Sequence, residues 1–209
     1  MVAIVDYGVG NLFSLKSSLN AIGAEVVVTD DKKVLESADQ IILPGVGAFE
    51  DAAEKLRKNG LDIVIKELAK SGKPLMGICL GMQMLFDKSF EYGEHKGLGL
   101  IKGVVKPIKD YVPAEYKIPH IGWNALKFKG EPSPIFADIN DGDCVYFVHS
   151  YYATDCDESK IATAEYGAEL TAAVADKNVF GCQFHPEKSG KIGLSILKAF
   201  VSLKEGFIC

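Results

Sequence analysis

The sequence lacks several features that mark common classes of protein. It has five cysteines in 209 residues, and no two of them form a Cys-x-x-Cys pair. An odd number of scattered cysteines argues against a disulfide framework and a zinc ribbon, and it favours a reducing, cytoplasmic location. No apolar run approaches the roughly 18 residues of a membrane-spanning helix, and the N-terminus lacks the basic segment of a signal peptide. We therefore expect neither a membrane span nor a secreted, disulfide-stabilised fold.

A surplus of basic charge is also missing. The 23 lysines and arginines are outnumbered by 28 aspartates and glutamates, which gives a net charge of −5, and no lysine or arginine block occurs. Because nucleic-acid binding depends on clustered positive charge, nucleic acid is not an expected partner. Hydrophobic residues make up 48% of the chain, which is enough for a sizeable core, and nothing in the length requires a second domain. We predict one domain over residues 1–209.

What the sequence does contain is an alternation of short apolar runs with amphipathic segments. This alternation predicts parallel strands joined by crossover helices, with antiparallel additions in the Gly- and Pro-rich middle of the chain. The expected fold class is a single α/β domain whose mixed, mostly parallel sheet is flanked by helices. The expected strands are 2–6, 25–29, 40–43, 74–78, 104–108, 119–122, 125–128, 144–148, 161–166, 170–175 and 179–184, and the expected helices are 12–22, 32–36, 50–58, 61–70, 80–86 and 192–203.

One cysteine stands where a buried strand is expected to become a helix. Residues 77–81 are Gly-Ile-Cys-Leu-Gly, the layout of the G-x-S-x-G nucleophile elbow with sulfur in place of oxygen. Glycines on both sides suit a sharp turn where a Cβ atom would clash, and the helix N-terminus that follows favours a thiolate. We therefore predict that Cys79 is a nucleophile. The remaining cysteines lack this setting and are interpreted as buried structural residues: Cys144, Cys156, Cys182 and Cys209.

A histidine and a glutamate two residues apart follow the last expected strand. In an extended segment, His185 and Glu187 project toward the same face, which suits a base and the carboxylate that orients it. His149, at the end of another expected strand, is an alternative base. Cys182 lies three residues before His185, but no second ligand pair accompanies it, so no metal is expected.

Two glycine-containing loops also follow expected strands. Residues 44–49 are Pro-Gly-Val-Gly-Ala-Phe, and their backbone N–H groups can form an oxyanion hole together with the amide of Leu80. Residues 6–11 are Asp-Tyr-Gly-Val-Gly-Asn, only part of the G-x-G-x-x-G phosphate-binding pattern. We favour the oxyanion interpretation for 45–47 and leave a phosphate cradle at 6–11 as an alternative.

Three of these motifs together resemble one enzyme family. Gly-Ile-Cys-Leu-Gly-Met-Gln at 77–83, Pro-Gly-Val-Gly at 44–47 and His-Pro-Glu at 185–187 have the order and spacing of the class I (triad) glutamine amidotransferases. Within that family, segments 6–14, 119–124 and 185–189 resemble the glutaminase subunit of imidazole glycerol phosphate synthase, which acts in histidine biosynthesis. The resemblance extends over essentially the whole chain.

The resemblance implies a flavodoxin-like domain that hydrolyses glutamine to glutamate and ammonia through a thioester on Cys79, without a cofactor. His185 and Glu187 would complete the triad. The remaining implied sites are an oxyanion hole at Val46, Gly47 and Leu80, a glutamine site at Gly47, Gln83, Ser150 and Tyr151, and a partner interface at Asn11, Trp123 and Lys188.

The resemblance also implies a partner. The ammonia would pass to a cyclase subunit, a (β/α)8 barrel that forms a heterodimer with this chain, and react there to give imidazole glycerol phosphate and aminoimidazole carboxamide ribotide. The resemblance further implies that the isolated chain is a poor glutaminase, because family members waste little glutamine when no acceptor is present. Val46 stands between two glycines, so its peptide could rotate its N–H into or out of the site and give the partner a switch.

Other functions stay open on the sequence alone. A glutaminase subunit for anthranilate, GMP, carbamoyl phosphate or pyridoxal phosphate synthesis would share the chemistry, although the segments at 6–12 and 122–124 argue against it. A non-catalytic regulatory module or a nucleotide-binding flavodoxin-like protein would share the fold. The intact set of Cys79, His185 and Glu187 argues against a non-catalytic module.

Overall fold

The computed structural model describes residues 1–131, 133–204 and 206, so the expectation for Cys209 lies outside the described residues. The helices in this part are α1 (Leu12–Ala21), α2 (Lys32–Ser37), α3 (Phe49–Lys58), α4 (Leu61–Lys70), α5 (Leu80–Met84) and α6 (Gly190–Val201), with 3-10 turns at Ile108–Asp110, Pro134–Phe136 and Pro186–Lys188. The strands are β1 (Val2–Val5), β2 (Val26–Thr29), β3 (Gln40–Leu43), β4 (Leu75–Ile78), β5 (Lys88–Ser89), β6 (His95–Lys96), β7 (Val104–Pro107), β8 (His120–Ala125), β9 (Lys127–Phe128), β10 (Cys144–His149), β11 (Tyr151–Thr154), β12 (Lys160–Glu165), β13 (Glu169–Asp176) and β14 (Val179–Cys182).

The main sheet has eight strands in the order β2-β1-β3-β4-β14-β13-β12-β9. The first five are parallel, and the last three are added antiparallel. The parallel part has the 2-1-3-4-5 order of flavodoxin-like folds, with β14 in fifth place. The expected α/β class with a mixed, mostly parallel sheet is confirmed.

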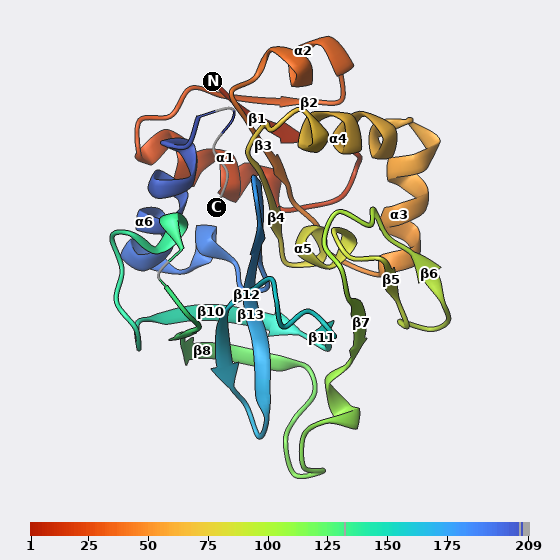
Figure 1. Ribbon diagram of the computed structural model, residues 1–209, viewed down its shortest axis with the longest axis vertical. Coiled ribbons are helices and arrows are strands. Elements are labelled where there is room, and N and C mark those ends of the chain that lie inside the picture. The colour runs from red at the N-terminus through yellow and green to blue at the C-terminus, as the bar shows by residue number, and fades with distance from the viewer. Residues whose placement is uncertain (132, 205, 207–209) are drawn as a thin grey trace.

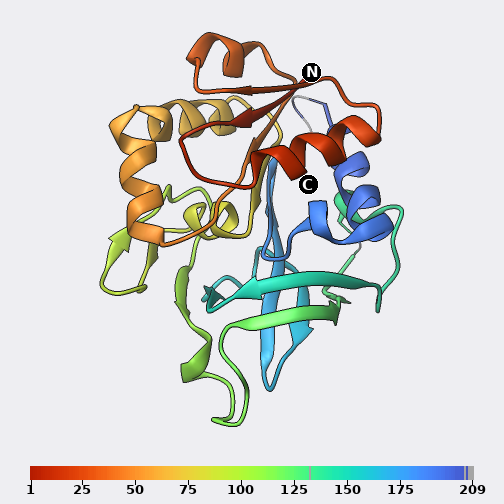
Figure 2. The same ribbon diagram turned by 180° about the vertical axis from the view of Figure 1, so that it is seen from behind.

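Both faces of the parallel strands β1, β3, β4 and β14 are buried, because alternate side chains along each strand point to opposite helical layers, whereas the edge strand β2 is half-buried. Ala3 and Val5 of β1 belong to one apolar cluster with residues of α3 and α4. Val2 and Ile4 belong to a second cluster with residues of α1 and α6. Figure 1 shows α3 and α4 on one side of the sheet, and Figure 2, from behind, shows α1 and α6 on the other.

The middle of the chain differs from the single sheet that the sequence led us to expect. It forms two further sheets, an antiparallel pair of β10 and β8 and a four-stranded sheet in the order β11-β7-β5-β6. The sequence pattern missed β5, β6 and β11. β5 and β6 are only two residues long, and all three depend on pairing with other strands: β5 and β11 with β7, and β6 with β5. α5 is also shorter than expected, and β14 ends at Cys182 rather than at residue 184.

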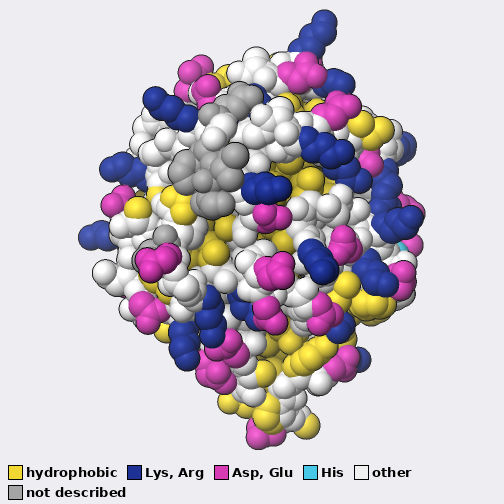
Figure 3. Space-filling view, viewed as in Figure 1, with side chains coloured by type: hydrophobic (Ala, Val, Ile, Leu, Met, Phe, Trp, Pro, Cys, Tyr) yellow, Lys and Arg dark blue, Asp and Glu magenta, His cyan; other side chains and the backbone are white. Residues whose placement is uncertain are grey.

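The surface carries charges of both signs, interspersed over the face seen in Figure 3, with hydrophobic side chains gathered near its lower end. Among the described residues, no helix combines the length and the apolar character that a bilayer crossing requires. Cys144 is exposed, so the expectation of a buried residue is wrong there, whereas Cys156 and Cys182 are buried. The Cys144 side chain is exposed because Cys144 lies at the first, exposed position of β10.

Candidate active site

Cys79 lies on the sharp turn between β4 and α5. Its backbone has φ 54° and ψ −111°, a strained conformation for a residue with a side chain. A Cβ atom on Gly81 would lie 1.9 Å from the carbonyl oxygen of Leu43, and one on Gly77 would lie 2.6 Å from that of Gly81. The expected reason for the two glycines is therefore confirmed: the strand and the helix cross too closely for any side chain.

His185 and Glu187 form a buried pair beside this turn. The imidazole Nδ1 lies 2.8 Å from Glu187 Oε1, and both side chains are 3% exposed. The sequence predicted that the two side chains meet because they project from the same face of an extended segment. This explanation is wrong, because β14 ends at Cys182 and Glu187 lies in the 3-10 turn Pro186–Lys188. The turn folds the carboxylate back onto the ring. Since Nδ1 is occupied by Glu187, Nε2 is the ring nitrogen left for Cys79.

The hydrogen bonds of His185 outweigh its burial. Burial lowers the pKa of His185, but hydrogen bonds to Cys79 and Glu187 and the negative charges of these partners raise it to about 9. At neutral pH the imidazole therefore carries the proton that a leaving amine needs. Glu187 Oε2 is buried and has no hydrogen-bond partner among the described residues.

A cavity of about 400 Å³ opens over Cys79. It is bordered by segments that lie far apart in the sequence: the loop after β3, the start of α5, the β5–β6 connection, the residue before β8, the end of β10 with the β10–β11 connection, and the segment after β14. The residues expected from the sequence that line it are Val46, Gly47, Cys79, Leu80, Gln83, Ser150, Tyr151, His185 and Lys188. Glu187 lies behind His185, as an orienting group would.

The loop at 44–47 approaches the elbow closely. A Cβ atom on Gly45 would lie 2.7 Å from the backbone nitrogen of Gly81, and Gly47 has φ +92°. Leu80 is the first residue of α5, so its N–H has no acceptor within the helix. The buried Tyr7 hydroxyl donates to the Pro44 carbonyl at 2.6 Å and holds the start of the loop. The loop and the Leu80 amide thus lie together beside the sulfur.

Gln83 is held in place by its amide nitrogen. Nε2 donates to the Tyr151 carbonyl at 3.0 Å and to Gln183 Oε1 at 3.0 Å, and the side chain is 5% exposed. Both donated bonds point the nitrogen into the protein and leave Oε1 to accept from a ligand. Gln83 is therefore a positioned pocket residue and not a solvated surface residue.

The sequence interpretation missed one carboxylate in this pocket. Glu91 lines the cavity, and its Oε2 accepts a hydrogen bond from the Phe49 N–H at the start of α3 at 2.6 Å. Burial raises the pKa of Glu91, although the Phe49 hydrogen bond opposes this effect. Glu91 stands in a mostly polar stretch without periodicity, so no local pattern distinguished it.

The alternative base, His149, has both ring nitrogens engaged. Nε2 lies 3.0 Å from His120 Nδ1, and Nδ1 lies 2.9 Å from the Tyr151 carbonyl. Burial lowers the pKa of His149 to about 3. A ring held in this way has no free nitrogen for a proton from Cys79, which argues against the alternative base.

Of the three residues expected at a partner interface, Lys188 lines the pocket, Trp123 packs against the same tyrosine ring as Lys188, and Asn11 stands at the start of α1. Asn11 caps α1 by accepting from the Ser14 N–H, and Trp123 on β8 is 58% exposed. Lys188 Nζ lies 6.0 Å from the Tyr146 ring centroid, and Trp123 meets the same ring edge-on at 6.1 Å. Lys188 also lines the cavity, so the surface around Trp123 adjoins the site.

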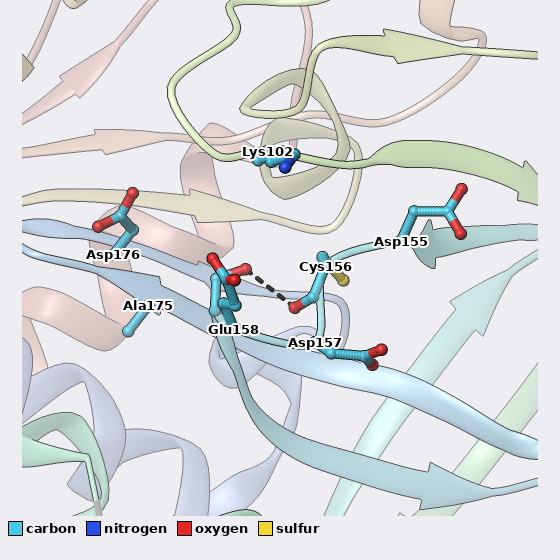
Figure 4. Close-up of a pocket in the computed structure, with 8 residues that line it drawn as sticks. Lys102, Asp155, Cys156, Asp157, Glu158, Ala175 and Asp176 are labelled. Atoms are coloured by element: carbon cyan, nitrogen blue, oxygen red, sulfur yellow. Dashed lines mark hydrogen bonds between the residues drawn. The ribbon is translucent and has the colours of Figure 1, made fainter.

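A second hollow of about 340 Å³ lies elsewhere, between the loop before β7 and the β11–β12 connection. Lys102 and the carboxylates of Asp155, Asp157 and Asp176 border it, but Asp155 and Asp176 stand at opposite sides and do not converge (Figure 4). Burial raises the pKa of Cys156 there. We assign no chemistry to this hollow, because it brings no nucleophile and base together.

The chain is similar to one protein family over nearly its whole length. Residues 3–203 match the family model described as "Glutamine amidotransferase class-I". The chain belongs to the class I glutamine amidotransferase family. Family members similar to it include proteins named imidazole glycerol phosphate synthase subunit HisH. The one from Bacillus cereus is 49% identical over 99% of this chain and 97% of its own, and that from Bacillus cytotoxicus is 50% identical over 96% and 93%.

Solved structures share the family fold. A structure titled "Crystal structure of glutamine amidotransferase" matches with a TM-score of 0.74 at 20% identity, over 96% of this chain and all of that one. The structure of PurLQS from Thermotoga maritima matches with a TM-score of 0.73 at 24% identity, over 96% and 97%. At these identities the likeness concerns the fold, which is the α/β fold of the glutamine amidotransferase family.

Proposed function

We propose that the chain is the glutaminase subunit of imidazole glycerol phosphate synthase and hydrolyses glutamine to glutamate and ammonia for histidine biosynthesis. The observation that carries the chemistry is the 2.8 Å hydrogen bond between His185 and Glu187 beside Cys79, in a site where Cys79 and His185 line one cavity large enough for a small polar ligand. The near full-length similarity to the HisH subunits supports the choice of pathway.

In the first half-reaction, Cys79 Sγ attacks the side-chain amide carbon of glutamine. The oxygen becomes an oxyanion and accepts hydrogen bonds from the Leu80 N–H and from an N–H of the loop at Val46 and Gly47, an effect worth roughly 3 kcal/mol per donor. His185 gives its proton to the amide nitrogen, the C–N bond breaks, and ammonia leaves a γ-glutamyl thioester on Cys79.

In the second half-reaction, a water molecule attacks the thioester. His185 takes one proton from the water, the carbon–sulfur bond breaks, and glutamate and free Cys79 result. Glu187 keeps the same imidazole tautomer through both halves by holding Nδ1–H. The buried, acceptor-only carboxylate suits this orienting role and needs no protonation change of its own.

The pocket offers complementary groups for the amino-acid end of glutamine. Gln83 Oε1 and the Glu91 carboxylate are acceptors for the α-ammonium group, and the backbone of Gly47, Ser150 and Tyr151 borders the place for the α-carboxylate. These positions leave the side-chain amide of glutamine to reach Cys79.

The partner in this proposal is the (β/α)8-barrel cyclase subunit, bound as a heterodimer over the face with Asn11, Trp123 and Lys188. Trp123 is a large exposed side chain, of the kind enriched at interfaces, and it contacts Tyr146 beside Lys188. Because Lys188 also borders the cavity, ammonia released there has a short way to a partner on this face. A cytoplasmic location is part of the same proposal.

The test is glutamate release from glutamine by the purified chain, with and without the cyclase subunit and its ribotide ligand, beside a Cys79→Ala control. We expect activity that requires the cyclase and disappears in the control. Activity that survives in Cys79→Ala would refute the nucleophile. Full activity of the chain alone would refute the partner-dependent oxyanion loop, and no activation by the cyclase would refute the choice of partner.

A further inference from the structure

Two buried histidines next to the pocket take no part in the proposed chemistry. His120 on β8 and His149 on β10 lie directly opposite one another in the antiparallel pair and are 2% and 5% exposed. His120 Nδ1 lies 3.0 Å from His149 Nε2, and His149 Nδ1 lies 2.9 Å from the Tyr151 carbonyl oxygen. Three polar groups thus form a continuous buried series that ends at a residue of the glutamine pocket.

The partners determine where the protons are. A carbonyl oxygen can only accept, so His149 Nδ1 must carry a hydrogen, and in a neutral ring Nε2 must then accept. His120 Nδ1 therefore donates to it. The rings are neutral because burial lowers the pKa of both, and the His120 ring is stacked between Phe147 at 4.9 Å and Tyr166 at 4.0 Å. Each histidine has one allowed tautomer.

The Tyr151 carbonyl receives two donors, His149 Nδ1–H and Gln83 Nε2–H. Together with Gln183 Oε1, the other acceptor of Gln83 Nε2–H, this carbonyl sets the orientation of the Gln83 amide, and that orientation decides whether Oε1 or the nitrogen faces a ligand. If the His149 bond were lost, the carbonyl would be free to turn, and Gln83 could present a donor where the ammonium group of an amino acid needs an acceptor.

We propose that His120 and His149 are positioning residues for glutamine binding, a neutral imidazole pair that aligns the Tyr151 carbonyl and, through it, Gln83. The inference rests on the proposed function. β8 carries His120 on its buried side and Ile121 and Trp123 on its exposed side, at 57% and 58% exposure. The pair therefore joins the strand of the proposed cyclase face to the substrate pocket.

The decisive experiment compares two amide substitutions at one position in the complex with the cyclase. The amide of His149→Asn lies near the place of Nδ1 and keeps the bond to Tyr151, whereas the longer His149→Gln reaches the place of Nε2 and keeps only the bond to His120. We expect His149→Gln to raise KM for glutamine at least about tenfold, the factor that equals about 1.4 kcal/mol. Its kcat stays within about threefold of the wild type. We expect His149→Asn to have a KM for glutamine much closer to that of the wild type.

The inference is refuted if His149→Gln has the same KM for glutamine as the wild type. It is also refuted if His149→Gln and His149→Asn show the same fall in kcat and the same rise in KM. A purely structural role gives that second result, and urea unfolding shows whether either variant is folded. Nitrogen NMR of the wild-type chain gives an independent test: both rings should be neutral with the hydrogen on Nδ1, and a charged ring or the opposite tautomer would overturn the proposal. If the wild-type complex itself releases no glutamate, the proposed function fails. If the wild-type complex is active and His149→Gln leaves KM for glutamine unchanged, only the positioning role fails.

Discussion

The buried pair of His185 and Glu187 predicts a pH-dependent term in the stability of the fold. Hydrogen bonds to Cys79 and Glu187 raise the pKa of His185 from 6.5 to about 9, against the effect of burial. A raised pKa means that the folded state binds the proton more tightly than the unfolded state does. The stabilisation is therefore fully present below pH 6.5 and is lost as the pH rises through about 9.

The size of the effect follows from the same shift. A rise in the pKa of His185 of about 2.5, at 1.36 kcal/mol for each pKa unit, corresponds to about 3 kcal/mol of stabilisation. Solvent screens this interaction little, because the side chain of His185 is 3% exposed. Cys79 and Glu187 share this effect. Glu187→Gln keeps the shape but removes one of the two contributions, so we expect it to remove about 1–2 kcal/mol of the pH-dependent stability.

The assay is urea unfolding of the wild type and Glu187→Gln across the range from about pH 6 to pH 10, under reducing conditions. The difference in free energy of unfolding between the two proteins should be largest at the acid end and shrink by about 1–2 kcal/mol toward the alkaline end. Two curves that run parallel over the whole range would refute the reasoning, because the carboxylate would then have no effect on the proton affinity of His185.

Three further substitutions test other parts of the site. Glu91→Gln should raise KM for glutamine about tenfold with little change in kcat. The amide still accepts from the Phe49 N–H but no longer offers a negative charge to an ammonium group. An unchanged KM would exclude this role. Gly81→Ala should cost about 3 kcal/mol or more in urea unfolding, since its Cβ would overlap the Leu43 carbonyl, whereas the exposed Ser17→Ala on α1 should change little; equal stabilities would contradict the close crossing. Trp123→Ala should weaken cyclase binding in calorimetry at least about tenfold while thermal unfolding stays the same, and undiminished binding would remove β8 from the interface.

Features that depend on neighbouring residues were readable from the sequence. The elbow at Cys79 is one, because the clash that demands glycine at 77 arises with Gly81 and Met82 in the same strand-to-helix turn; the clash at Gly81, with Leu43 at the end of β3, depends on the tertiary structure. The bounds of β3 and α4 agree with the expected ranges, since their apolar periods are clear over the whole segment. The amidotransferase family also follows from motif order alone, and the family match confirms it.

Features that depend on distant parts of the chain were not readable. Glu91 enters the pocket because its carboxylate meets the first N–H of α3, 42 residues away. His149 looked like a possible base at a strand end, and only its pairing with His120, 29 residues earlier, shows that both nitrogens are occupied. The turn that brings Glu187 onto His185 replaced an extended strand that periodicity had suggested.

The sequence by itself thus determined the α/β class and the strand-to-helix turn that carries Cys79, because each depends on a local pattern of residue types. Only the tertiary structure decided how the strands divide into three sheets, which carboxylate reaches the pocket and which tautomers the buried histidines adopt. The physical reason is that a hydrogen bond in a buried site depends on which groups are brought within 3 Å, and that is decided by the packing of segments far apart in the chain.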